Sequence, residues 1–186
     1  MSTAHDIAKR LDAGEPVLLP TETVWGLAAR AGDARGVGAI YRLKGRSDAK
    51  PLAVCVASRA QAAALAEVNS AAEALMDAHW PGPLTLVLPV RAGAPIQPQC
   101  TDGGRTVALR CPAVEWRETL CAEPLALTSA NVSGERAVES EAQAAQLFPQ
   151  VARLSDPDPD TRGEPTTIVR VEGESLAVLR QGGLRL

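Results

Sequence analysis

The sequence predicts a single α/β domain covering residues 1–186, in which helices pack on a mixed sheet. Apolar runs of strand length, at residues 52–57 and 84–90, alternate with stretches whose apolar residues have helical spacing. Two further runs, residues 166–171 and 175–179, flank Glu172-Gly173-Glu174 and predict a terminal hairpin. A chain of 186 residues can bury a substantial core, and we see neither an internal repeat nor a domain boundary.

Helices are expected where a capping residue precedes apolar residues at three- and four-residue spacing. Ser2 or Thr3 would begin the first helix, Asp33 the second, and Ser58 and Ser70 two alanine-rich helices. Further helices are expected at residues 113–121 and 140–148. The strands that precede the hairpin are expected at residues 17–19, 24–29, 52–57, 84–90, 106–110, 125–128 and 151–154.

Composition and charge exclude several classes of function. A net charge of -3, a pI near 5.5 and only three Trp, one Tyr and one Phe argue against a protein whose main role is to coat nucleic acid. No apolar run is long enough to span a bilayer, and the N-terminal residues are too polar for the core of a signal peptide. We therefore expect a cytoplasmic protein without a membrane segment.

The cysteines give no indication of a metal centre. Cys55, Cys100, Cys111 and Cys121 form no C-x-x-C pair, and neither histidine lies at a zinc-ligand spacing from them. We expect free, mostly buried thiols and no metal ion held by the protein itself. A nucleophilic Cys/His pair stays open on residue types alone, although no spacing supports it.

A cluster of basic residues follows the second expected helix. Arg42, Lys44, Arg46 and Lys50 stand within residues 41–50, where Asp48 is the single acid. Ammonium and guanidinium groups crowded into a glycine-containing loop suit a polyanion such as a phosphate chain. The alternative is a solvated helix end, because cations favour the negative C-terminal pole of a helix.

Four motifs in series carry a family resemblance. Residues 20–52 contain PTETVWGL and KGRSDAKPL, and they are followed by WPGPLTLVL at 80–88, TVALR at 106–110 and SANVSG at 129–134. In this order and at these distances, the motifs resemble the YrdC-like family over residues 7–182. The resemblance implies a twisted open sheet with a concave, basic face.

The resemblance also implies an activity. In the family, the amine of L-threonine captures bicarbonate as a carbamate, and a carbamate oxygen attacks the α-phosphorus of ATP. The products would be threonylcarbamoyl-adenylate, used for the threonylcarbamoyladenosine modification of tRNA, and pyrophosphate. Such a nucleotidyltransferase depends on positioning and charge neutralisation, so Mg²⁺ is expected to accompany ATP. Other implied partners are a downstream threonylcarbamoyl-transferase complex and, with weak affinity, tRNA.

Site residues are carried over from the matching motif positions. The catalytic residues implied by the resemblance are Lys44 and Arg46. The residues implied for ATP are Arg46, Lys50, Thr106, Ser129, Asn131 and Arg180, and those implied for threonine are Thr23, Arg110 and Thr166. Thr106 and Arg110 lie four apart on one expected strand and therefore point to the same side.

Each carried-over role has an alternative. Ser129 and Asn131 could simply bond their own turn, and Thr23 and Thr166 could reflect β-propensity alone. The sequence also departs from the family: Trp25 stands where Tyr or Phe is usual, Cys55 where many relatives have His, and Ala137 where many have Ser. The last two departures each put one substrate contact in doubt.

Two other functions remain open beside the synthase. One is an RNA-binding or ribosome-associated module that uses the basic concave face, and the acidic pI weighs against it as a primary role. The other is a carbamoyl-adenylating domain of the hydrogenase-maturation type. Relatives of that type are much longer chains, which weighs against it.

Overall fold

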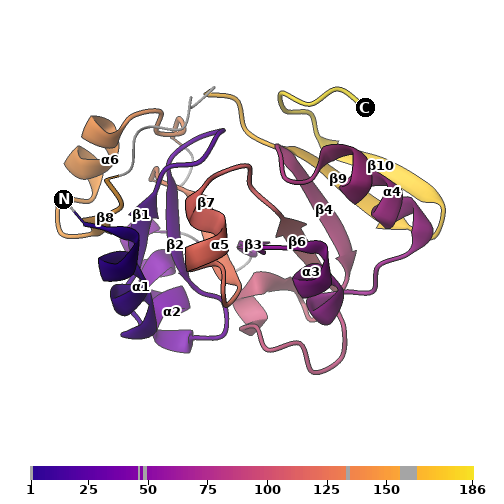
Figure 1. Cartoon of the computed structure of the whole chain (residues 1–186), viewed down its shortest axis with the longest axis horizontal. Helices are drawn as coiled ribbons and strands as arrows, with labels where there is room; N and C mark the ends of the chain where they lie inside the picture. Colours follow the sequence, from indigo (N-terminus) through magenta and orange to yellow (C-terminus); the bar gives the residue numbers. More distant parts are fainter. Residues whose placement is uncertain (1, 46, 48–49, 133–134, 156–162) are drawn as a thin grey trace.

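One mixed sheet organises the whole molecule. The computed structural model describes residues 2–45, 47, 50–132, 135–155 and 163–186. Its strands pair in the order β10-β9-β4-β6-β3-β7-β2-β1-β8, with β5 paired to β6. Three of these pairs are parallel, β1 with β8, β3 with β6 and β4 with β9. Figure 1 follows the sheet from β8, near the N terminus, to the β9–β10 hairpin near the C terminus. The predicted α/β domain with an open mixed sheet is confirmed.

The elements have the following bounds. The helices are α1 Ala4–Asp12, α2 Ala34–Lys44, α3 Arg59–Leu65, α4 Ser70–His79, the 3-10 turn η1 Pro98–Cys100, α5 Trp116–Leu120 and α6 Glu141–Leu147. The strands are β1 Val17–Leu19, β2 Gly26–Arg30, β3 Ala53–Cys55, β4 Leu84–Pro89, β5 Thr101–Asp102, β6 Thr106–Arg110, β7 Leu125–Ser129, β8 Ala152–Arg153, β9 Thr167–Glu172 and β10 Ser175–Arg180.

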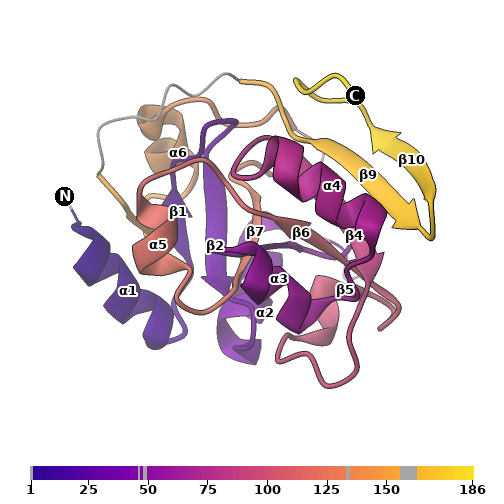
Figure 2. The same ribbon diagram turned by 45° about the vertical axis from the view of Figure 1, so that its right-hand side comes forward.

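Successive strand residues face opposite sides of the sheet and so form two buried layers. Leu18, Leu27 and Val54 belong to the layer that packs beneath α2, α3, α4 and α6. Leu19 and Leu125 belong to the other layer, beneath α1 and α5. Figure 2 shows α3 and α4 lying together in front of β6 and β4.

Helix starts follow the capping residues with one exception. Thr3 forms a capping box with Asp6, and the Asp33 and Ser58 side chains accept backbone N–H groups of α2 and α3. The predicted cap at Ser70 is wrong. Asn69 caps α4 instead, because its Oδ1 accepts the backbone N–H of Ala72 at 2.9 Å.

Strand β2 lies further along the chain than residues 24–29. It includes Arg30, whose charge argues against a buried strand position when only the sequence pattern is considered. The charge is compensated because Arg30 Nη2 lies 2.7 Å from Asp12 Oδ1 and Nη1 donates to the Leu120 carbonyl at 2.7 Å. The ion pair with Asp12 therefore allows a buried arginine to be the last residue of β2.

A β-bulge near Leu179 changes the face that Arg180 presents. Val178 pairs with Val169 and Arg180 pairs with Ile168, so the extra residue on β10 is Leu179. Val169 belongs to the layer beneath α4, whereas Ile168 lines the opposite face. Plain alternation along β10 would put Val178 and Arg180 on one strand face, and the bulge instead places them on opposite faces.

Candidate active site

A cavity of about 560 Å³ lies on the sheet face that also packs against α1 and α5. Its floor is a row of paired residues that crosses five neighbouring strands. Cys55 of β3 pairs with Arg110 of β6, Arg110 pairs with Thr85 of β4, Thr85 pairs with Ile168 of β9, and Ile168 pairs with Arg180 of β10. All five residues line the cavity because paired residues in a sheet share a face.

The turn between β1 and β2 forms one wall. Thr21 Oγ1 accepts the backbone N–H of Val24 at 3.1 Å and lies 2.9 Å from Thr23 Oγ1. Trp116 Nε1 donates to the Pro20 carbonyl at 2.7 Å and so ties this turn to α5. Thr23 is therefore held as a buried hydroxyl at the cavity wall.

Arg110 is the central charge of the floor. Only 6% of the residue is exposed, and its Nη2 lies 2.8 Å from Glu22 Oε2. This contact is an ion pair without hydrogen-bond geometry. Neither Nη2 nor Nε has a hydrogen-bond partner in the described part of the chain. A buried guanidinium with unused donors is suited to bind an anion such as a carboxylate.

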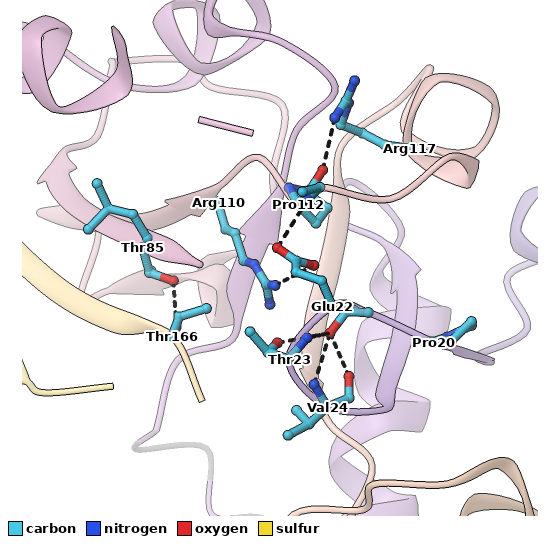
Figure 3. Close-up of polar contacts among 12 residues, drawn as sticks. Pro20, Glu22, Thr23, Val24, Thr85, Arg110, Pro112, Arg117 and Thr166 are labelled. Atoms are coloured by element: carbon cyan, nitrogen blue, oxygen red, sulfur yellow. Dashed lines mark hydrogen bonds and ion pairs between the residues drawn. The ribbon is translucent and has the colours of Figure 1, made fainter. Parts of the chain in front are cut away.

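A network of hydroxyls lies on the other side of Arg110. Thr85 Oγ1 is 2.9 Å from Thr166 Oγ1, and Arg180 Nη2 donates to Thr166 Oγ1 at 3.0 Å. Figure 3 shows Arg110 between the Thr85–Thr166 pair and Glu22. Burial and the nearby charge of Arg110 lower the pKa of Arg180 below the ordinary arginine value. Two cations thus approach each other at one cavity, which favours an anionic ligand.

The turn after β7 forms the opposite wall. Ser129 Oγ donates to Asn131 Oδ1, and Asn131 Nδ2 donates to the Glu135 carbonyl at 2.8 Å. Beneath this turn, the buried ammonium of Lys44 donates to the backbone carbonyls of Ser129 and Asn131. The C-terminal end of α2 therefore fixes the geometry of the turn.

The cavity brings together most of the residues assigned by resemblance. Six of them line it, namely Thr23, Arg110, Ser129, Asn131, Thr166 and Arg180. Thr106 has the predicted face of β6 but pairs with Pro89, too far along the strand to line the cavity. Lys50 is exposed beside Pro51 at the cavity, and Lys44 lies behind the Ser129 turn. Arg46 lies outside the described residues.

Two residues at the site were missed by the sequence analysis. Thr85, only 3% exposed, lies within the apolar run LTLVL, where a lone threonine resembles an ordinary strand residue. Glu22 lies in the run PTET, where no local spacing indicates that its partner is the distant Arg110.

The thiols are not poised for nucleophilic chemistry. All four cysteines are free and buried, which confirms the prediction. Burial raises the pKa of Cys55, which lies on the cavity floor, to about 12. The thiol is therefore protonated at neutral pH and acts as an apolar floor residue.

No resident metal site is evident in the described residues. They contain no group of three or more His, Cys, Asp or Glu that could hold a metal ion. The described part of the cavity lining includes one carboxylate, Glu135. A divalent cation at this site would consequently depend on oxygens of its ligand, such as phosphates. Within the described residues, no helix is long and apolar enough to cross a membrane.

A second hollow, of about 650 Å³, contains Arg30 and Asp12. Arg30 is already bonded to the Asp12 carboxylate and to the Leu120 carbonyl. The donors of Arg30 are therefore used within the protein. Arg110 has donors without hydrogen-bond partners, so its cavity is the better candidate for a ligand site.

Comparison with known proteins identifies the family. Residues 9–182 match the Sua5/YciO/YrdC family, described as "Telomere recombination". The chain belongs to this family. This description names a cellular process and no reaction.

Individual relatives include enzymes and a ligand complex. The chain is 36% identical to the threonylcarbamoyl-AMP synthase of Bacillus subtilis, a match covering 95% of this chain and 52% of that protein. It is 36% identical to a putative threonylcarbamoyl-AMP synthase of Mycobacterium tuberculosis, covering 92% of this chain and 80% of that one. The crystal structure of Pyrococcus abyssi Sua5 complexed with L-threonine superposes with a TM-score of 0.89 at 37% identity, covering 97% of this chain and 54% of that one. The chain thus spans about half the length of the first of these relatives.

Proposed function

We propose that this protein is a threonylcarbamoyl-AMP synthase, a nucleotidyltransferase that uses L-threonine, bicarbonate and ATP. The observation that carries the proposal is Arg110, a buried cation with unused donors on the floor of a cavity that Arg180 also lines. The relatives at 36–37% identity support it, since two are named as such synthases and one was solved with L-threonine.

Threonine would bind over the β6 part of the floor. Its carboxylate is complementary to the free donors of Arg110, and Thr23 and Thr166 offer hydroxyls on either side. A bidentate carboxylate–guanidinium contact would fix the amino acid and direct its amine towards the rest of the cavity. Bicarbonate and this amine would form the carbamate with loss of water.

ATP would bind between the Ser129–Asn131 turn and Arg180. Arg180 would neutralise phosphate charge from the β10 side, and Arg46 and Lys50, which follow α2 in the sequence, would add further positive charge. Lys44 would act mainly by holding the turn through the Ser129 and Asn131 carbonyls. Attack of a carbamate oxygen on the α-phosphorus would then release pyrophosphate. The chain contributes position and charge rather than a nucleophile.

Mg²⁺ would enter with ATP as part of the substrate. The cavity lining in the described residues, with Glu135, Ser129 and Asn131 as oxygen donors, fits a cation that keeps most of its bonds to phosphates and water. When bound, it would neutralise charge on the phosphates. The proposed setting is the cytoplasm, with the adenylate passed to a threonylcarbamoyl-transferase complex that modifies tRNA.

Substrate dependence of pyrophosphate release tests the proposal. We expect release from ATP to require both L-threonine and bicarbonate, with the acyl-adenylate detected by mass spectrometry. Release that instead requires carbamoyl phosphate would indicate chemistry of the hydrogenase-maturation type. An RNA-binding module would release no pyrophosphate under either condition, and either result would refute the synthase.

A further inference from the structure

We propose that Glu22 is a positioning residue that fixes the guanidinium of Arg110 for the carboxylate of the substrate. This inference rests on the proposed function, because it gives Arg110 the role of binding an amino acid. Glu22 does not line the cavity, so its effect on the substrate would pass through Arg110.

Glu22 is held rigidly behind the floor. Its Oε1 accepts the backbone N–H of Ala113 at 3.1 Å, in the segment that follows β6. Its own backbone belongs to the turn that the Thr21 hydroxyl closes by accepting the N–H groups of Thr23 and Val24. The side chain is 15% exposed, so one carboxylate oxygen is fixed and the other is presented to Arg110.

Glu22 and Arg110 form an ion pair without forming a hydrogen bond. Oε2 lies 2.8 Å from Arg110 Nη2, yet neither atom has a hydrogen bond within the described residues. Glu22 therefore neutralises the buried guanidinium while leaving its Nε and Nη2 donors unused. A substrate carboxylate can take Nε without displacing a partner, and at Nη2 it would join the ion pair that Glu22 Oε2 makes.

The residues beside Arg110 on the floor do not neutralise its positive charge, so Glu22 does. Thr85 and Cys55, which pair with it on β4 and β3, are neutral at pH 7, and Arg180 repels it. Glu22 is the acid within ion-pair distance of Arg110 in the described part of the chain. Without that charge, a guanidinium that is 6% exposed would lose its anchor and its orientation towards the ligand.

The decisive variant is Glu22→Gln. The amide keeps the shape and an oxygen for the Ala113 N–H, but it removes the negative charge. We expect the Kd for L-threonine, measured by calorimetry, to rise at least about tenfold, with the Kd for ATP changed less than about twofold. Glu118→Gln is the matched control, because it removes an exposed acid paired with Arg117 and should leave both constants unchanged.

A double-mutant cycle distinguishes positioning from a structural role. If Glu22 acts through Arg110, Glu22→Gln should lower kcat/KM for threonine by less than about twofold in an Arg110→Gln background. Additive losses would show that Glu22 acts independently of Arg110, and they would overturn the inference. If Glu22→Gln fails to fold, Glu22→Asp and Glu22→Ala are compared instead. The inference then requires that Glu22→Asp, which keeps the charge, binds threonine with an affinity closer to that of the wild type than Glu22→Ala does.

The outcomes also separate this inference from the proposed function. A wild-type protein that releases pyrophosphate independently of threonine overturns both. A threonine-dependent wild type with an unchanged Kd in Glu22→Gln overturns the positioning role alone.

Discussion

Arg180 Nη2 donates to Thr166 Oγ1 at 3.0 Å and to the Thr166 carbonyl at 2.8 Å. The same Thr166 hydroxyl lies 2.9 Å from Thr85 Oγ1. A hydroxyl with two such neighbours has a fixed orientation, so β10 determines how the Thr166 wall faces the cavity.

Arg180→Ala should weaken ATP binding about tenfold or more. A charge-assisted hydrogen bond contributes roughly 1.5–3 kcal/mol, and the Thr166 hydroxyl would also lose its donor. Calorimetric titration with ATP measures the effect. Arg185→Ala is the control, since Arg185 is exposed and near the same end of the chain. An unchanged Kd together with an unchanged Tm would remove Arg180 from the nucleotide site.

Arg46→Ala and Lys44→Ala should both abolish pyrophosphate release, but for different reasons. Loss of a cation at the developing phosphoryl charge costs a few kcal/mol, so Arg46→Ala should lower the rate at least about a hundredfold with an unchanged Tm. Lys44→Ala leaves the Ser129 and Asn131 carbonyls without their buried donor. The lost hydrogen bonds should lower the free energy of unfolding by more than about 2 kcal/mol, and therefore the Tm by roughly 4 °C or more.

The control for this pair is Lys9→Ala, which removes an exposed lysine of α1. Calorimetric melting and a coupled pyrophosphate assay give the two readouts. Activity of Arg46→Ala within twofold of wild type would contradict its assignment, and an unchanged Tm in Lys44→Ala would contradict its role beneath the turn.

Gly182→Ala should impair both stability and ligand binding. A Cβ at this position would lie 2.5 Å from the Thr166 carbonyl carbon and 2.6 Å from the Thr167 nitrogen, so backbone would have to move. Either the C-terminal segment or the Thr166 wall would then be displaced. Gly38→Ala, within α2, is the matched control and should stabilise the helix slightly. Wild-type Tm and Kd values in Gly182→Ala would show that the segment adapts without affecting the site.

Stability should fall as the pH rises above about 9. Burial raises the pKa of Cys55 and Cys100 from an ordinary 9.0 to about 12. The folded protein therefore binds more protons than the unfolded chain between these values, and the stabilisation present below pH 9 is lost as the pH approaches 12. A Cys55→Ala/Cys100→Ala variant should show a shallower decline of Tm with pH, and an equal slope would contradict this explanation.

The same thiols should be dispensable for turnover. A variant in which all four cysteines are Ala or Ser is expected to be less stable, because the side chains are buried, but still to release pyrophosphate. Complete loss of activity in a variant that remains folded, shown by its Tm, would require a covalent mechanism.

Local patterns predicted most of the elements, because their causes are local. Asp33 and Ser58 cap helices as expected, and Val37, Ile40 and Lys44 share the buried face of α2. The register of β10 could not be predicted in this way. The bulge near Leu179 depends on how β10 pairs with β9, and it decides which side of the sheet receives Arg180.

The candidate site was predicted in part. Motif positions located Arg110, Thr166 and the Ser129 turn, all of which line one cavity. The same reasoning placed Thr106 there from its strand face, although the cavity ends before that residue. Glu22 was missed because a buried ion pair joins segments that are far apart in sequence, and no local spacing reveals the partner. The basic character of the concave face, like the role of Arg46, stays a prediction.

The floor row that runs from Cys55 to Arg180 has a consequence for synthesis at the ribosome. Strand β4 has β6 on one side, but its other neighbour, β9, begins only at residue 167. A nascent chain therefore exposes one edge of β4 through much of its translation, and such an edge invites pairing with other chains. The binding floor is completed only when β9 and β10 emerge, so the ability to hold a ligand arises as this edge is covered.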